Sequence, residues 1–207
     1  MVAKREQLVA RLARALAFDL SDPARVALDT WLDRLEEWNA RIDLTAARSP
    51  EELVDLMLAD ALVLAARLPP RSRVVDVGSG AGAPGLPLAL VRPDLAVTLV
   101  EPLQKRVSFL RTVVGALGRT DITLRHARGE TLAASAPFDV ALSRATLPPP
   151  EWLALAADLV AGGGQAWALL AGDTPPSHPR ATLVTDHAYA WPLTGVRRRA
   201  LCFRIAA

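Results

Sequence analysis

The sequence contains one cysteine, three histidines and no long apolar run, and each shortage excludes a class of protein. A lone Cys202 cannot form an internal disulfide framework, so we expect the reducing cytoplasm as the location. His126, His178 and His187 are scattered without the spacing of metal ligands, and we expect no metal site. No apolar stretch approaches the roughly 18 residues that cross a membrane, so we expect no membrane association.

The chain also carries little net charge, +2 at neutral pH, and this charge alone does not indicate a nucleic-acid partner. Apolar residues make up 51% and charged residues 22% of the 207 residues. That composition supports a full hydrophobic core and fits one α/β domain with a modest extension. The sequence carries no signal of oligomeric state, and we take a monomer as the expectation.

The pattern of apolar residues changes near residue 70. In residues 1–70 apolar positions recur at helical spacing, with predicted helix starts at Ser21-Asp22-Pro23 and at Ser49, the last helix running to about Arg67. From Val74 onward, short apolar runs alternate with helical stretches, which predicts βαβ units and a mostly parallel central sheet. The last two runs, 181–184 and 201–205, should pair antiparallel. We therefore expect an N-terminal helical extension, 1–70, packed on an α/β domain, 71–207.

The segment Val74 to Gly85, VVDVGSGAGAPG, has the pattern of a strand, a glycine-rich turn and the start of a helix. Glycines permit positive φ and let a ligand approach the backbone closely, and a helix N-terminus directs N–H groups toward that ligand. Glu101 ends the next predicted strand, 19 residues after Gly82, where a carboxylate can accept hydrogen bonds from ribose hydroxyls. The segment therefore predicts a cofactor site.

Two cofactors fit this segment. Gly80 to Gly85 matches the dinucleotide pattern G-x-G-x-x-G, whereas Asp76 to Gly82 matches D-x-G-x-G-x-G, which is typical of methyltransferases that use S-adenosylmethionine. A carboxylate at Asp76 would repel a pyrophosphate but could hold the ammonium of a methionine moiety. We therefore favour S-adenosylmethionine over a dinucleotide, with a tight turn that binds nothing as the remaining alternative.

Several stretches together resemble the ribosomal RNA small-subunit methyltransferase G family, also called glucose-inhibited division protein B. They are Trp38-Asn39 with Leu44-Thr45, Asp76 to Pro87, Val91-Arg92-Pro93, Lys105 to Arg111, and Phe138-Asp139 with Ser143-Arg144-Ala145. The resemblance implies a Rossmann-like class I methyltransferase fold that uses S-adenosylmethionine. It also implies methyl transfer to N7 of a guanine in 16S rRNA, with the rRNA or the 30S ribosomal particle as partner.

Carried over by position, the resemblance places cofactor contacts in the glycine loop and after the third and fourth strands. The expected cofactor-binding set is Asp76, Gly78, Ser79, Gly80, Gly82, Ala83, Glu101, Gly129, Glu130 and Arg144. Guanine N7 already presents a lone pair, so no base must remove a proton, and catalysis can rest on proximity and alignment. Arg144, together with Arg128 beside the same pocket, is therefore a candidate for positioning, and no catalytic residue is assigned.

The chain departs from the family pattern outside the loop. Leu56-Met57 stand where members commonly have Arg-His, Ala171 where a lysine is usual, Ala200 where a histidine follows arginine, and Asp43 where asparagine is usual. These losses of basic side chains leave two alternatives open. One is a methyltransferase acting on a different RNA or a small molecule, and the other is a cofactor-binding, RNA-associated module without turnover.

Three further features each have two interpretations. Arg197 to Arg199 are expected in a turn before the last strand, either against an rRNA backbone or in solvent. Lys105 and Arg106 begin a helix, where cations are unfavourable, and either bind phosphate or are solvated. Trp31 and Trp38 lie seven apart on one helical face, which favours core packing over base stacking.

Overall fold

The computed structural model describes residues 2–132, 137–172 and 174–206. Its first part is helical, as the spacing predicts, with α1 (Val2–Ala15), α2 (Asp22–Asn39), α3 (Pro50–Val54) and α4 (Asp60–Ala65). The hydroxyls of Ser21 and Ser49 cap α2 and α3 by accepting hydrogen bonds from backbone N–H groups in their first turns. Within the described ranges, no helix combines the length and apolar character needed to cross a membrane.

A π-helical segment interrupts the third predicted helix. Residues Asp55–Ala59 form this segment, η1, between α3 and α4, where the sequence predicts one continuous helix. Such segments are rare and occur frequently at functional sites. Here two buried carboxylates flank the segment: Asp55 is its first residue, and Asp60 comes directly after its last residue.

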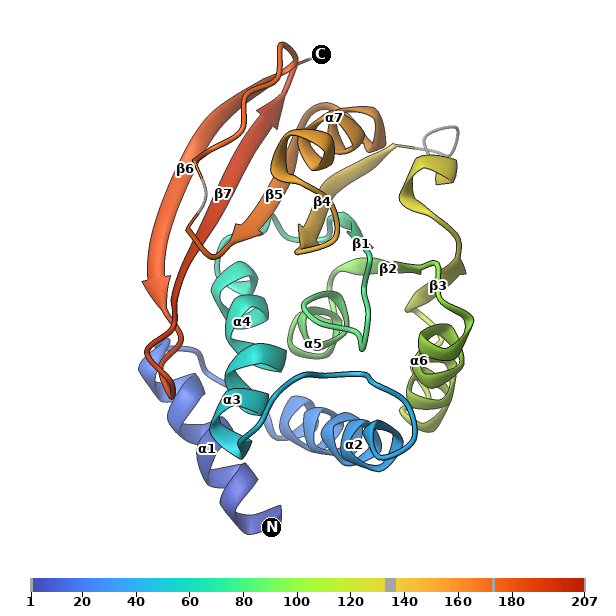
Figure 1. Cartoon of the computed structure of the whole chain (residues 1–207), viewed down its shortest axis with the longest axis vertical. Coiled ribbons are helices and arrows are strands. Elements are labelled where there is room, and N and C mark those ends of the chain that lie inside the picture. The colour runs from blue at the N-terminus through green and yellow to red at the C-terminus, as the bar shows by residue number, and fades with distance from the viewer. Residues whose placement is uncertain (1, 133–136, 173, 207) are drawn as a thin grey trace.

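A seven-stranded sheet forms the centre of the molecule, in the order β3-β2-β1-β4-β5-β7-β6 (Figure 1). The first five strands are parallel, and β7 pairs antiparallel with both β5 and β6, so the predicted mostly parallel sheet and antiparallel end are confirmed. The strands are β1 (Arg73–Val77), β2 (Ala96–Glu101), β3 (Thr123–His126), β4 (Phe138–Arg144), β5 (Val160–Leu170), β6 (Ala181–Ala190) and β7 (Arg197–Ile205). The connecting helices are α5 (Gly85–Val91), α6 (Gln104–Ala116), the short 3-10 helix η2 (Gly129–Leu132) and α7 (Pro149–Leu159).

The three consecutive arginines lie in β7, so the prediction that they form a turn is wrong. Arg197, Arg198 and Arg199 pair with Ala190, Tyr189 and Ala188 of β6. Arg198 and Arg199 are half-buried and face the carboxylates of Asp60 and Asp186, while Arg197 is exposed. Pairing with a long antiparallel neighbour overrides the polarity that suggested a turn.

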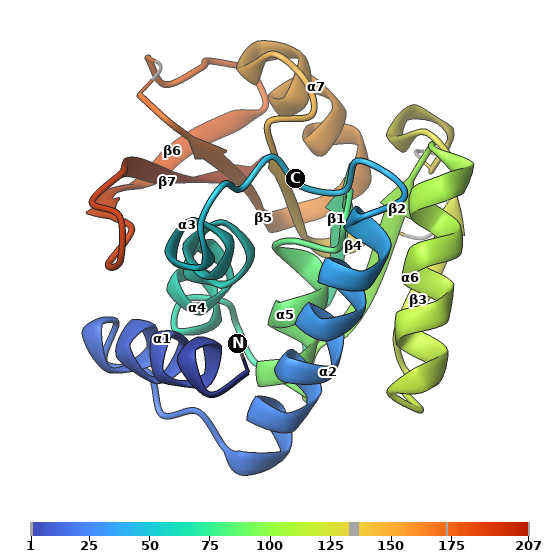
Figure 2. The same ribbon diagram turned by 60° about the horizontal axis from the view of Figure 1, so that its bottom comes forward.

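Each face of the sheet has its own apolar core. On one face, Val74, Leu99, Leu142 and Trp167 pack with buried side chains of α1, α2, α4, α5 and α6. On the other face, Val75, Ala141 and Phe203 pack with α7. The N-terminal helices thus cover the same face as α5 and α6, and α2 packs against both (Figure 2).

The structure confirms the predicted burial of Trp31 and Cys202. Trp31 is fully buried, and Trp38 packs its ring against Phe109 of α6 at 5.7 Å between centroids. Cys202 lies in β7, and burial raises the pKa of its thiol to about 11. The thiol is therefore protonated at neutral pH, which suits an inert core residue.

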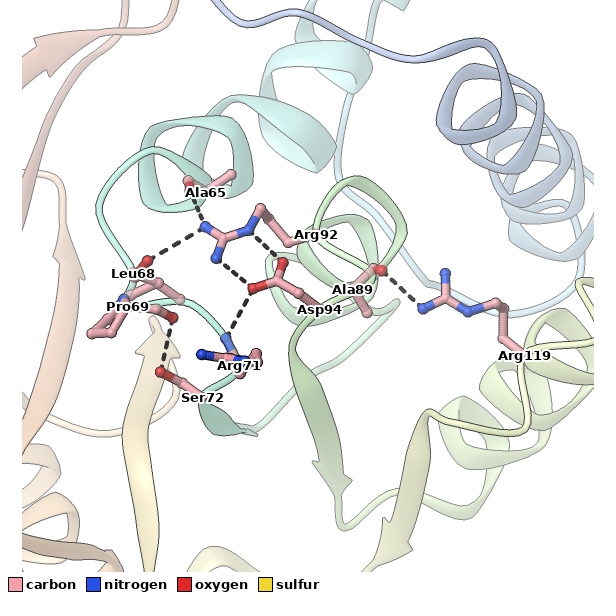
Figure 3. Close-up of polar contacts among 9 residues, drawn as sticks. All are labelled: Ala65, Leu68, Pro69, Arg71, Ser72, Ala89, Arg92, Asp94 and Arg119. Carbon is pink, nitrogen blue, oxygen red and sulfur yellow. Dashed lines mark hydrogen bonds and ion pairs between the residues drawn. The ribbon is translucent and has the colours of Figure 1, made fainter.

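Arg92, at the end of α5, connects the end of α4 to the turn that leads into β2 (Figure 3). Its guanidinium donates to the carbonyls of Ala65 and Leu68, where α4 ends, and pairs with Asp94 at 2.7 Å. Asp94 in turn accepts from the backbone N–H of Arg71, two residues before β1. Orphan carbonyls at a helix C-terminus need such donors, so this contact holds the passage from α4 to β1 in place.

Candidate functional site

A cavity of about 630 Å³ opens where β1, β2 and β4 end. Ligands of open α/β sheets bind beyond the carboxyl ends of the strands, so the position agrees with that rule. Six of the predicted cofactor-binding residues line it: Gly78, Ser79, Gly80, Ala83, Glu101 and Arg144. The sequence did not assign the rest of its lining, which is Leu44, Thr45, Ala46, Leu56, Met57, Ala81, Pro102, Leu103, Arg106, Ala145 and Thr146.

The glycine loop is held open by backbone conformation and by bonds to β2. Gly78 and Gly80 have φ of 74° and 58°, a region that favours glycine. The N–H groups of Gly78 and Ser79 both donate to the carbonyl of Val100, at 2.8 and 3.0 Å. A Cβ added to Gly78 would lie 2.2 Å from Oγ1 of Thr146, so the residue after the Ser-Arg-Ala triplet also requires glycine there.

Glu101 joins the glycine loop to the start of α6. It is 1% exposed and lies at the end of β2. Its Oε2 accepts from the N–H of Gly80 at 2.8 Å, and its Oε1 accepts from the N–H of Leu103 at 2.9 Å. Each carboxylate oxygen can accept a second hydrogen bond, so the side chain can fasten both segments and still face a ligand.

Asp76 lies beneath the loop and lines neither this cavity nor the smaller second cavity described below. Its Oδ2 accepts from the N–H of Gly85 at 3.0 Å, while Oδ1 is buried without a hydrogen-bond partner. Burial raises the pKa of this carboxyl to about 7. Gly82 also lies outside both cavities, against Leu86 and Leu110.

The raised pKa of Asp76 predicts a pH dependence of stability. Below about pH 4 the Asp76 carboxyl is protonated in both the folded and the unfolded chain. Between about pH 4 and 7 it is ionised in the unfolded chain and still protonated in the folded one. The contribution of Asp76 to stability is therefore fully present below about pH 4 and is lost as pH rises to about 7. Asp76→Asn keeps an oxygen for the Gly85 N–H and removes this titration.

Urea unfolding of both chains across that pH range measures the effect as a difference. We expect the wild-type free energy of unfolding to fall relative to Asp76→Asn as pH rises. Asp139→Asn is the matched control, because pairing with Arg73 lowers the pKa of Asp139 and gives the opposite sign. A pH-independent difference between wild type and Asp76→Asn would contradict the prediction.

A second cavity of about 240 Å³ adjoins the first and is lined by two further predicted cofactor-binding residues. Gly129 and Glu130 of η2 line it together with Arg128. Gly78 and Thr146 line both cavities, so the two spaces meet where the glycine loop faces the end of β4. The structure thus brings eight of the ten predicted cofactor-binding residues and Arg128 to the lining of these two cavities. Asp76 is a ninth if it is counted as a support of the loop, and Gly82 lies in packing.

Arg144 lines the main cavity, but its guanidinium is already engaged. Nη1 donates to the carbonyl of Leu56 in η1 and lies 3.1 Å from Oδ2 of Asp60. The Arg144 side chain is 12% exposed and that of Asp60 is 1% exposed. Arg144 is therefore part of the cavity wall, and its partner Asp60 is buried behind it.

Helix α2 supports the site from behind, a role that the sequence did not reveal. The indole N–H of Trp31 donates to the carbonyl of Ala81 in the glycine loop at 3.1 Å. At the end of α2, Oδ1 of Asn39 accepts from the N–H groups of Leu44 and Thr45 at 2.8 and 3.0 Å. The segment from α2 to α3 is thereby held across the sheet end (Figure 2). Leu44 and Thr45 of this segment form one wall of the cavity.

Asn39→Ala should therefore loosen that wall. Two hydrogen bonds worth about 0.5–1.5 kcal/mol each are lost, so amide exchange at Leu44 and Thr45 should accelerate about tenfold or more. Hydrogen exchange measured by NMR gives this directly. Asn39→Asp keeps an acceptor oxygen and should retain protection; equal acceleration in both variants would show that the side-chain oxygen does not hold the segment.

Two neighbouring cationic side chains of α6 lie at or next to the cavity. Arg106 of α6 is half-buried and lines the main cavity, and the neighbouring Lys105 is exposed. Across residues 2–132, 137–172 and 174–206, no group of three or more His, Cys, Asp or Glu side chains could hold a metal ion. The chemistry offered by the described residues is thus one buried carboxylate, backbone N–H groups, two arginines and an apolar wall.

Comparison with known proteins gives consistent matches. A family model described as rRNA small subunit methyltransferase G matches residues 25–177. The ribosomal RNA small subunit methyltransferases G of Myxococcus xanthus (strain DK1622) and Anaeromyxobacter dehalogenans (strain 2CP-C) are 32% and 35% identical, with 97% and 96% of both chains covered. A solved structure of an MtNAS variant in complex with S-adenosylmethionine has a TM-score of 0.61 and 17% identity, and the match covers 89% of this chain and 77% of that one. This likeness confirms the predicted Rossmann-like class I fold.

Proposed function

The chain belongs to the ribosomal RNA small subunit methyltransferase G family, and from this membership we propose that it transfers a methyl group from S-adenosylmethionine to N7 of a guanine in 16S rRNA. The observation that carries the proposal is the cavity at the end of β1, β2 and β4, lined by the glycine loop and Glu101. Its volume of about 630 Å³ lies within the range of small-molecule sites.

The residues present fit such a donor. Glu101 offers carboxylate lone pairs for ribose hydroxyls, and the positive φ of Gly78 and Gly80 leaves the loop backbone bare toward the cavity. Gly129 and Glu130 line the adjoining space, which suits the base of a nucleoside. When bound, S-adenosylmethionine supplies the methyl group. Asp76, whose free oxygen lies beneath the loop, is proposed to support the loop rather than to reach the cavity.

The chain's own contribution to the reaction is positional. Guanine N7 presents a lone pair in the plane of the base, so the site needs no general base. Leu44, Leu56 and Met57 form an apolar wall that excludes water and can hold a flat base against the cavity. The base must be unpaired or flipped out to enter. Arg106 in the cavity lining and the neighbouring exposed Lys105 are proposed to contact RNA phosphates.

The departures from the family pattern lie in two kinds of place. Leu56 and Met57 are in the cavity wall, so their loss of charge bears on the acceptor. Ala200 is fully buried in β7 and so cannot meet a substrate directly. The apolar wall therefore favours one of the two alternatives, a methyltransferase whose acceptor is another RNA or a small molecule.

Two measurements test the proposal in order. Calorimetry with S-adenosylmethionine tests the donor site, and absence of binding would overturn it. Incubation of 30S subunits and of naked 16S rRNA with labelled donor then tests the acceptor. Label at N7 of a guanine in 16S rRNA is expected. Normal donor binding without label in rRNA would instead favour the other acceptors or a module without turnover. We further propose that the protein acts as a monomer in the cytoplasm, and light scattering checks the first point.

A further inference from the structure

Asp60 is a buried carboxylate with four partners from distant parts of the chain. Its Oδ1 accepts from the hydroxyl of Tyr189 at 2.6 Å and from the indole N–H of Trp191 at 2.8 Å. Its Oδ2 lies 3.1 Å from Nη1 of Arg144 and 3.7 Å from Nη2 of Arg198. The side chain is 1% exposed, so these groups replace water almost completely.

The cluster around Asp60 contains more positive than negative side chains. One carboxylate, Asp60, faces two guanidinium groups whose side chains are each 12% exposed. Arg198 stacks over the ring of Trp191 at 4.9 Å, and its Nε has no hydrogen-bond partner. Asp60 is the carboxylate within hydrogen-bond distance of Arg144, and Arg144 is the member of the cluster that lines the cavity.

The π-helical segment makes this arrangement possible. Asp55 and Asp60 both contact the β6–β7 hairpin. Asp55 accepts from the N–H groups of Leu193 and Thr194, and Asp60 accepts from Tyr189 and Trp191. Between them, the carbonyl of Leu56 accepts from Arg144. Arg144 is therefore held at two points by one short segment, which fixes its guanidinium against the cavity wall.

The position of this ion pair matters because of the charge of the donor. A sulfonium is a cation, and an uncompensated guanidinium in a poorly hydrated wall would repel it. We propose that Asp60 is a positioning residue that holds Arg144 at the cavity wall and cancels its charge there, so that the site accepts a cationic sulfonium donor. This inference rests on the proposed use of S-adenosylmethionine.

The test compares two ligands that differ in this one charge. S-adenosylhomocysteine lacks the methyl group and is a neutral thioether at sulfur, while its adenosine, ammonium and carboxylate groups are the same. The ratio of the two Kd values therefore isolates the response to the sulfonium charge. In Asp60→Asn, calorimetry should show the preference for S-adenosylmethionine over S-adenosylhomocysteine reduced about 5- to 10-fold.

Three variants separate this role from a structural one. Tyr189→Phe removes one hydrogen bond to Asp60 without changing charge, and its ratio should stay at the wild-type value. Arg144→Met removes the cation and leaves Asp60 with Arg198, so the preference for the sulfonium should rise about 5- to 10-fold. Because the ratio of Kd values should change in the opposite direction in Arg144→Met, this variant tests the inference even if Asp60→Asn fails to fold.

The outcomes are distinct. Equal weakening of both ligands in Asp60→Asn, or an unchanged ratio in Arg144→Met, would overturn the inference and leave the proposed function intact. A wild-type chain that binds neither ligand would overturn the proposed function, and this inference with it.

Discussion

Replacing Glu101 by alanine should weaken binding of S-adenosylmethionine by about 2–4 kcal/mol, roughly 30- to 1,000-fold in Kd. The loss has two sources. The carboxylate is the proposed acceptor for the ribose hydroxyls. It also holds the N–H groups of Gly80 and Leu103, so its removal frees the glycine loop and the first turn of α6 together. Calorimetry on the purified chain measures the change.

Two controls bracket this result. Glu101→Gln keeps the shape and one oxygen but turns an NH₂ group toward one of the backbone donors, so its affinity should lie between wild type and alanine. Glu151→Ala removes an exposed carboxylate from the start of α7 and should leave Kd unchanged. Wild-type affinity in Glu101→Ala would mean that this side chain neither contacts the donor nor orders the loop.

Replacing Trp31 by alanine should lower the free energy of unfolding by about 3–5 kcal/mol. The side chain is fully buried, and its removal leaves a cavity. It also leaves the carbonyl of Ala81 without its indole donor, which disturbs the glycine loop. Chemical denaturation measures the free energy of unfolding. Calorimetry at a temperature where the variant is still folded should also show weaker binding of S-adenosylmethionine.

A second core substitution in the same helix separates the two effects. Leu28 is also fully buried in α2, but its hydrocarbon side chain makes no hydrogen bond to the loop. Leu28→Ala should cost about 2–5 kcal/mol of stability with little change in Kd for the donor. If both variants lose donor affinity equally, the Trp31 hydrogen bond has no special part in shaping the loop.

The parts of the site that the sequence predicts are those built from contacts close along the chain. The turn from β1 into α5 follows from a strand, several glycines and a helix start within Val74 to Gly85. Glu101 follows from the next parallel strand, because its place relative to the loop is set by β1–β2 pairing. Each of these relations extends over fewer than about 30 residues, as in any βαβ unit.

The parts that the sequence did not predict depend on packing between distant segments. Trp31 reaches Ala81 across 50 positions, and Arg144 reaches Asp60 across 84. Such polar contacts leave no periodic signal, because a single side chain on each partner is enough. The π-helical segment was missed for a related reason: its apolar residues still follow a helical pattern, and the buried carboxylates that distinguish it resemble solvated helix positions.

The partners of Asp60 also determine when the helical half can be completed during synthesis. Asp60 and Tyr189 are 129 positions apart, which at about 5–20 residues per second separates their appearance by roughly 6 to 26 seconds. Throughout that interval the carboxylates of Asp55 and Asp60 lack the hydrogen-bond donors of the β6–β7 hairpin, and burying them would carry a desolvation cost. Segment η1 and the start of α4 therefore reach their final packing only when the β6–β7 hairpin supplies these hydrogen-bond donors.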